Sequence, residues 1–428
     1  MVKKLYVVVI FVIFITTLIS CSKTPDIPTF KVSFDSFGGN VVSDQMIKQN
    51  EMAVKPSDPS KGDYYFKGWE LDGELFDFSK PITKDITLKA IWEWMYYNNP
   101  VWEPILADPT IIRHEGTYYA YGTQDDGVWG TEYGLKYIPI IQSIDLITWS
   151  YTGSVFTGAT RPSWGTLNAG LWAPDIVKVG DKFNLYYSLS AWGDPNPGIG
   201  VASADHPAGP WVDHGKLFNS SEIGVNNSID PNVFYGQDGK LYLVWGSFRG
   251  IYGLELTEDG LNVKVGISEG ALNKIHLAGT PTEERFSTTT YEGAYIIFKD
   301  GYYYMFLSTG SCCNGLKSTY NVRVGRSINP MGPYVDHLGR TMKQASVGYQ
   351  VVSPSSFFVG VGHNAIATDD AGDYFIVYHG FDVLEPSHVG NSNRRSLLLD
   401  RLIWNEQGWP SVKDNIPSDG TELKPVIE

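Results

Sequence analysis

The sequence is poor in cysteine, with three in 428 residues. Cys21 stands alone, while Cys312 and Cys313 are adjacent, so the chain has neither a disulfide framework nor the C-x-x-C spacing of a metal or redox site. The adjacent pair could form a vicinal disulfide outside the cytoplasm or remain as two buried thiols. The sequence alone leaves both states open.

Basic residues are also scarce. Lys and Arg number 33 against 47 Asp and Glu, which gives a formal net charge of -14. Proteins that bind nucleic acid need a basic surface to neutralise phosphate, so we expect no nucleic-acid partner. A neutral polysaccharide is compatible with an acidic protein.

Long apolar runs are absent except at the N-terminus. Lys3 and Lys4 precede an almost wholly apolar run that ends at Leu18-Ile19-Ser20-Cys21 and resembles a bacterial lipobox. We therefore expect a lipoprotein signal peptide over residues 1–21, with lipid attached to Cys21. An ordinary signal peptide or a membrane-anchor helix is the alternative. The expected mature protein is an exported monomer, anchored by its lipid to the outer membrane or cell surface.

Aromatic residues, Gly and Pro are abundant. Aromatics make up 14% of the chain, with 45 Gly and 24 Pro, a composition that favours short strands joined by tight turns. After a polar tether over residues 22–29, residues 30–94 alternate like strands around Gly-Gly and Gly-Trp pairs. This segment resembles the InlB B-repeat (Listeria–Bacteroides repeat) module. It carries no clustered acids, bases or metal ligands, so we expect a spacer or adhesion role.

Residues 98–428 contain an internal repeat. Five segments each place a polar residue before a short apolar strand, a Gly- and Asp-rich turn, and an alternating aromatic strand that ends in small or polar residues. The marker residues lie 55 to 71 residues apart, a period that suits four-stranded blades: Asp108, Asp175, Asp230, Glu292 and His363. The sequence therefore predicts an all-β fold, a five-bladed β-propeller preceded by a small β-rich module.

In a propeller, the first strand of every blade lines the central channel. The five marker residues would then meet at one axis, and four of them are carboxylic acids. Acids gathered in one funnel repel one another and lose solvent, which raises the pKa of at least one of them. An acid/base hydrolase requires this arrangement.

The motifs of these segments resemble glycoside hydrolase family 43, and within it the endo-1,5-α-L-arabinanases. The general motifs are ADPTII, WAPDI, SIDPNVF, EGAYI and GHN, and the arabinanase-like stretch is GSCCNGLKSTYNVRVGRS at 310–327. The resemblance implies hydrolysis of α-1,5-linked arabinan with inversion at the anomeric carbon. An inverting enzyme holds its acid and base roughly 6.5–9.5 Å apart so that water fits between them.

The resemblance also implies the roles of individual residues. Asp108 would be the general base, Glu292 the general acid, and Asp230 the residue that orients the acid and raises its pKa. His363 would hold a structural calcium ion near the axis, with water completing its shell. Trp164, Trp172 and Asp175 are tentative substrate-binding residues, although the two tryptophans could equally anchor loops and Asp175 could brace its blade.

Two departures from the arabinanase pattern leave the mode of action open. Ala107 stands where a histidine often precedes the base, and the chain reads GSFRGIYGLEL at 246–256, where a bulkier aromatic segment is usual. The alternatives are an exo-acting α-L-arabinofuranosidase or β-xylosidase on the same scaffold, or a non-catalytic surface glycan-binding lipoprotein. The last predicts the loss of Asp108 or Glu292, and both are present.

Overall fold

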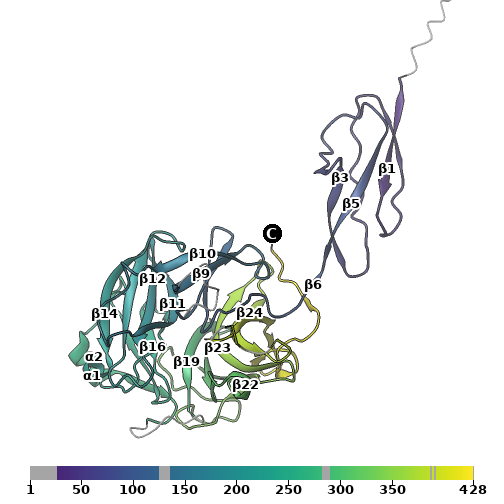
Figure 1. The fold of residues 1–428 in the computed structure, drawn as a ribbon. Coiled ribbons are helices and arrows are strands. Elements are labelled where there is room, and N and C mark those ends of the chain that lie inside the picture. Colours follow the sequence, from purple (N-terminus) through teal and green to yellow (C-terminus); the bar gives the residue numbers. More distant parts are fainter. Residues whose placement is uncertain (1–26, 125–134, 282–289, 386–387, 390–391, 428) are drawn as a thin grey trace, which may run out of the picture. The chain divides into compact units, whose positions relative to one another are not determined.

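The computed structural model describes residues 27–124, 135–281, 290–385, 388–389 and 392–427 (Figure 1). The chain divides between Met95 and Tyr96 into two compact units. The expected signal peptide and Cys21 lie outside the described residues. Within the described part, no helix has the length and apolar character needed to cross a membrane.

The N-terminal unit contains one mixed five-stranded sheet in the order β2-β1-β5-β3-β4, with β1 parallel to β5. Its core is small and aromatic, built around Val32, Phe34, Trp69 and Leu88. The strands are β1 (Thr29–Asp35), β2 (Gln45–Lys48), β3 (Tyr64–Leu71), β4 (Glu74–Leu75) and β5 (Ile86–Trp94).

The second unit contains five antiparallel sheets that follow one another along the chain. The first four have four strands each: β7 (Thr110–His114), β8 (Thr117–Tyr121), β9 (Tyr137–Ser143) and β10 (Ser150–Phe156); β11 (Gly170–Val179), β12 (Lys182–Ser190), β13 (Gly198–Ala204) and β14 (Val212–Asn219); β15 (Asn232–Tyr235), β16 (Leu241–Trp245), β17 (Ile251–Glu255) and β18 (Ile275–Ala278); β19 (Glu292–Lys299), β20 (Tyr302–Thr309), β21 (Asn321–Ser327) and β22 (Tyr349–Val352). The fifth contains β23 (Phe358–Thr368), β24 (Tyr374–Asp382) and β27 (Ser396–Arg401).

Shorter elements complete the second unit. Three two-stranded pairs are β6 (Tyr96–Tyr97) with β30 (Glu422–Leu423), β25 (His388–Val389) with β26 (Ser392–Asn393), and β28 (Ile403–Trp404) with β29 (Pro410–Ser411). The helices are α1 (Ser220–Ile223), α2 (Ile267–Asn273), η1 (Gly315–Lys317) and η2 (Lys413–Asn415).

The first strands of the five sheets form a ring. Strand β7 contacts β11, β11 contacts β15, β15 contacts β19, β19 contacts β23, and β23 contacts β7 again. Backbone from the start of the unit also pairs with the edge of the last sheet. Val101 N–H donates to Leu397 O at 2.9 Å, and Leu397 N–H donates to Trp102 O at 3.0 Å. The predicted five-bladed β-propeller is confirmed.

Neighbouring blades are joined near the axis by side chains that bind the next blade's backbone. The Asp175 carboxylate accepts hydrogen bonds from Val233 N–H (2.6 Å), Thr110 Oγ1 (3.1 Å) and Asn232 Nδ2 (3.3 Å). Asn232 Oδ1 in turn accepts Ile296 N–H at 2.9 Å. Because the buried polar groups in this row are paired, they connect four blades without leaving a desolvated donor or acceptor.

Candidate active site

In each blade a residue with a left-handed backbone, called here the entry residue, lies just before the first strand or within it. The φ angles are 53° at Asp108, 39° at Ala173, 59° at Asp230, 58° at Gly293 and 49° at His363. Only Gly and, less readily, Asp or Asn tolerate this region, so the surrounding structure must hold Ala173 and His363 in place. Space is also tight at Gly293, since a Cβ there would lie 3.1 Å from His363 Nδ1.

The preceding blade fixes four of these entry residues through their N–H groups. Each acceptor lies near the end of that blade's second strand, or just beyond it. The four bonds are Asp108 N to His379 Nδ1 (3.0 Å), Ala173 N to Thr123 Oγ1 (2.9 Å), Asp230 N to Ser188 Oγ (2.9 Å) and His363 N to Ser308 Oγ (2.8 Å).

This pattern corrects the repeat alignment of the marker residues at two blades. Ala173 in the second blade and Gly293 in the fourth are the positions equivalent to Asp108, Asp230 and His363. Asp175 therefore lies two residues after the entry residue of its blade, and Glu292 lies one residue before the entry residue of its own. The strand pairing slips at the same places, between Trp172 and Asp175 and between Glu292 and Tyr295. Because of these irregularities, Asp175 lies in the row of side chains that joins the blades, and Glu292 lies at the mouth of the active site.

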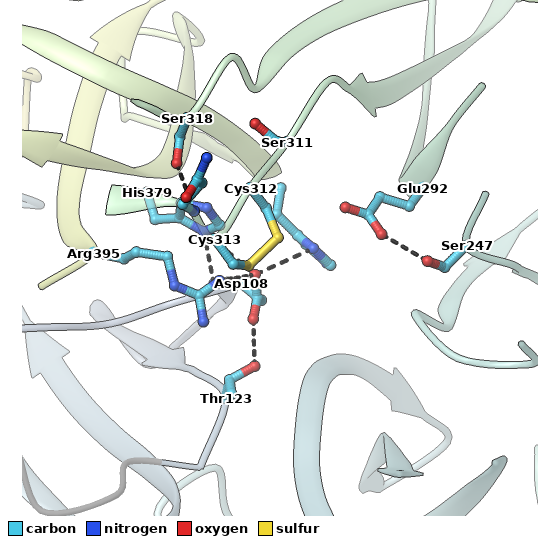
Figure 2. Close-up of a disulfide and its surroundings, with 12 residues drawn as sticks. Asp108, Thr123, Ser247, Glu292, Ser311, Cys312, Cys313, Ser318, His379 and Arg395 are labelled. Atoms are coloured by element: carbon cyan, nitrogen blue, oxygen red, sulfur yellow. Dashed lines mark hydrogen bonds and ion pairs between the residues drawn. A yellow bond between two sulfur atoms is a disulfide. The ribbon is translucent and has the colours of Figure 1, made fainter. Parts of the chain in front are cut away.

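Asp108 is surrounded by groups that favour its ionised form. Its Oδ1 accepts a hydrogen bond from Arg395 Nη1 at 2.9 Å, and its Oδ2 accepts one from Thr123 Oγ1 at 2.5 Å (Figure 2). His363 Nδ1 lies 3.4 Å from Oδ1. Burial alone would raise the pKa of the Asp108 carboxyl, but Arg395, the histidines and Thr123 hold that pKa well below its usual range.

The proton position on His379 follows from the same contacts. Its Nδ1 accepts the Asp108 N–H, so this nitrogen carries no proton. Burial lowers the pKa of His379 well below its usual value, and the positive charge of Arg395 adds to the effect. His379 is therefore a neutral acceptor that positions the Asp108 backbone, and Arg395 supplies the permanent positive charge.

Glu292 and Asp230 form a buried carboxyl pair with the opposite behaviour. Burial raises the pKa of Glu292 to about 7, although Ser247 Oγ donates to its Oε2 at 2.6 Å (Figure 2). Burial, followed by the negative charge of Glu292, raises the pKa of Asp230 well above its usual value. Because two like charges cannot both be accommodated without solvent, this pair holds a proton near neutral pH.

The arrangement can perform acid/base chemistry. Asp108 is ionised and can accept a proton from water, while Glu292 is protonated below about pH 7 and can then donate a proton to a leaving oxygen. The sequence reasoning missed four groups that produce this difference: Thr123, Ser247, His379 and Arg395. A signal existed for the first three, since each lies where the aromatic strand of a repeat ends in small or polar residues.

The residues proposed for a cation offer few donors. His363 is 13% exposed in its side chain, and the amide of Asn364, which follows it, has neither atom hydrogen-bonded among the described residues. Within that same part of the chain, no three His, Cys, Asp or Glu side chains are grouped as metal ligands. Such a donor set fits only an ion that keeps most of its water.

The tentative substrate-binding residues lie in different surroundings. Asp175 is buried between blades, as described above. Trp164 is half-buried, and its Nε1 donates to Tyr187 Oη at 3.2 Å. The half-buried Trp172 directly precedes the entry residue of the second blade, and its ring centroid lies 5.4 Å from that of Trp192, which is 82% exposed.

Comparisons with known proteins agree with this geometry. The family model "Glycosyl hydrolases family 43" matches residues 97–410, and that of the Listeria-Bacteroides repeat domain matches residues 30–91.

Two curated relatives cover the propeller. An extracellular exo-α-(1→5)-L-arabinofuranosidase of Cellvibrio japonicus is 31% identical over 72% of this chain and 86% of its own length. An extracellular endo-α-(1→5)-L-arabinanase of Bacillus subtilis is 32% identical over 72% of this chain and 87% of its own length. Among solved structures, a Cellvibrio cellulosa α-L-arabinanase complexed with arabinohexaose superposes with a TM-score of 0.62 at 29% identity, covering 72% of this chain and 96% of that one.

Proposed function

The chain belongs to glycosyl hydrolase family 43, and from this premise we propose that it hydrolyses the α-1,5-linked L-arabinofuranose chains of arabinan by an inverting acid/base mechanism, with endo action. The observation that carries the proposal is the opposite shift of two buried carboxyls, the pKa of Asp108 lowered and that of Glu292 raised. The presence of Asp108 and Glu292 argues against a protein that only binds glycans.

In this mechanism the substrate enters with its glycosidic oxygen toward Glu292. Glu292 protonates that oxygen while Asp108 takes a proton from the attacking water. Arg395 and Thr123 keep Asp108 ionised, and burial next to the Asp230 carboxyl favours the protonated form of Glu292. His379 holds the backbone of Asp108 in place by accepting its N–H.

The products of arabinan digestion test the proposal. Early mixed oligosaccharides from linear arabinan are expected from endo action, with an inverted anomer in the first proton NMR spectra. Release of one fixed short product would instead support exo action, as the name of the Cellvibrio japonicus relative suggests. A retained anomer, or binding of arabinan without cleavage, would overturn the proposed mechanism.

The pH dependence of activity should follow the protonation of Glu292, the proposed general acid. Because Glu292 must be protonated, kcat/KM is expected to fall as the pH rises through about 7, the raised pKa of this carboxyl. The acidic limb should lie far lower, because the pKa of Asp108 is depressed. In an Asp230→Asn variant, loss of the neighbouring negative charge should move the alkaline limb to lower pH. Initial rates across a pH series measure the two limbs in the parent and in the variant. An alkaline limb that does not move in the variant would count against an electrostatic interaction between Asp230 and Glu292.

We also propose that a hydrated calcium ion binds at His363. The support is the half-buried His363 imidazole next to Asn364, whose side-chain amide has no hydrogen bond among the described residues, and such an ion would supply fixed positive charge near Asp108. We expect about one calcium per chain by elemental analysis, and a loss of thermal stability of roughly a few degrees after chelation. A His363→Ala variant should contain no calcium and should not respond to the chelator. Equal calcium content in both proteins would exclude this site.

We further propose export, with lipid anchoring at Cys21 and no partner subunit. The two curated relatives are named as extracellular enzymes, which supports export, and the apolar run before Cys21 motivates the anchor. A Cys21→Ser variant is expected to leave the membrane fraction while keeping its activity. Membrane association that survives this substitution would contradict lipidation, and size-exclusion chromatography tests the monomer.

A further inference from the structure

The loop between β20 and β21 closes on itself beside the active site. Ser311 O accepts the N–H groups of Thr319 (3.0 Å) and Tyr320 (3.1 Å), and Ser311 N–H donates to Thr319 Oγ1 at 3.1 Å. Residues 312–318 therefore form a compact turn with a fixed neck. Inside this turn, Ser318 Oγ accepts Asn314 N–H at 2.9 Å.

Both ends of the loop are attached to groups of the active site. Before the loop, Ser308 pairs with Glu292 across the strands β19 and β20. After it, the ring of Tyr320 stacks on that of His379, with centroids 5.8 Å apart and planes 14° from parallel. Gly362 permits this packing, because a Cβ there would lie 2.3 Å from the Tyr320 ring. The turn is thus held at the mouth of the site.

The turn presents a disulfide between the adjacent residues Cys312 and Cys313. This settles the state that the sequence left open. Figure 2 draws Asp108, Arg395, Glu292 and Ser247 among the residues that surround the disulfide. Both cysteines are half-buried, so part of their surface remains open to solvent.

The disulfide differs chemically from the groups around it. The immediate surroundings of Asp108 are charged or polar, namely Arg395, Thr123 and the two histidines. Two bonded sulfur atoms instead offer a polarisable surface without a hydrogen-bond donor. A sugar ring has a face of C–H groups that needs such a surface when its hydroxyls bind elsewhere.

We infer that the Cys312–Cys313 disulfide is the apolar wall against which the arabinofuranose ring beside Asp108 packs, a positioning element for the reaction. The inference rests on the proposed function and names a further contact of the same site. The covalent bond between neighbouring side chains keeps both sulfur atoms in one place, so the ring meets a preformed surface and loses less freedom on binding.

Steady-state kinetics of substituted chains test the inference. The parent is the full chain with Cys21→Ser, which leaves Cys312 and Cys313 as its only cysteines. In Cys312→Ala/Cys313→Ala we expect KM for arabino-oligosaccharides to rise about tenfold, with a smaller loss in kcat. Cys312→Val/Cys313→Val, which restores apolar surface without the bond, should recover part of the affinity. Leu316→Ala, at an exposed position of the same turn, should leave KM unchanged.

Chemical reduction provides a second readout, and protection of the disulfide by bound sugar is the part that a purely structural role would not produce. A water-soluble phosphine and water convert the disulfide to two thiols and the phosphine oxide, so the reaction balances. Reduction should raise KM of the parent, and reoxidation should restore it, while the alanine pair does not respond. In a chain carrying Glu292→Gln, bound arabinohexaose should slow thiol release.

The outcomes separate the two levels of proposal. The proposed apolar wall would be overturned by either of two results. One is a folded, active Cys312→Ala/Cys313→Ala variant with the KM of the parent, and the other is unchanged kinetics after two thiols per chain have been titrated. A parent that cleaves no arabinan would overturn the proposed function itself. Equal thiol release with and without arabinohexaose would also contradict contact between the sugar and the disulfide.

Discussion

A Glu292→Gln variant is expected to lose about 10²–10⁴-fold in kcat on arabinan, because the amide cannot donate a proton to the leaving oxygen. The loss should depend on the leaving group. An aryl arabinofuranoside that releases dinitrophenolate needs no protonation, so the variant should cleave it at nearly the parent rate. Parallel assays on the polymer and the aryl substrate measure the difference.

The control is Glu255→Gln, which removes a carboxylate that pairs with Lys240 on the third blade. This variant should keep the parent rate on both substrates. Equal losses of Glu292→Gln on polymer and aryl glycoside would show that Glu292 is not the acid. A fully active Glu292→Gln enzyme would remove the mechanism altogether.

An Asp108→Asn variant should lose activity on both kinds of substrate by a similar factor, about 10²–10⁴-fold, since water is no longer deprotonated. The amide also leaves Arg395 without its carboxylate partner. Added azide, a nucleophile that needs no base, should restore turnover and give a glycosyl azide of inverted configuration. NMR of that product checks the result.

Folding must be verified for this variant, because Asp108 also binds His379 and Thr123. The His379 bond uses the backbone N–H and should survive. Circular dichroism and thermal melting close to those of the parent would establish that. Loss confined to the aryl substrate, or a glycosyl azide with retained configuration, would exclude Asp108 as the base.

The sequence predicted the propeller because its repeats combine periodic turns with alternating aromatic strands. It also indicated Asp108 and Asp230, each of which stands before a proline at the entry to a strand. It could not place Asp175 and Glu292 correctly, since a one-residue slip in strand pairing leaves no mark in residue types. These slips decide which carboxyl reaches the mouth of the site and which one joins blades.

The supporting groups were harder to predict because they come from distant segments. Arg395 lies in the last blade and binds a carboxylate in the first. Such a contact depends on closure of the ring, which no local pattern encodes. The vicinal disulfide was equally open, since adjacent cysteines are compatible with two redox states until their surroundings are known.

The closure of the ring has a consequence for the order of events during synthesis. Asp108 is made early, but His379 and Arg395, which hold its backbone and its charge, follow 271 and 287 residues later. A chain emerging from the ribosome or passing through a secretion channel therefore has no ionised base held in position. Hydrolytic competence therefore requires the last blade to dock on the first.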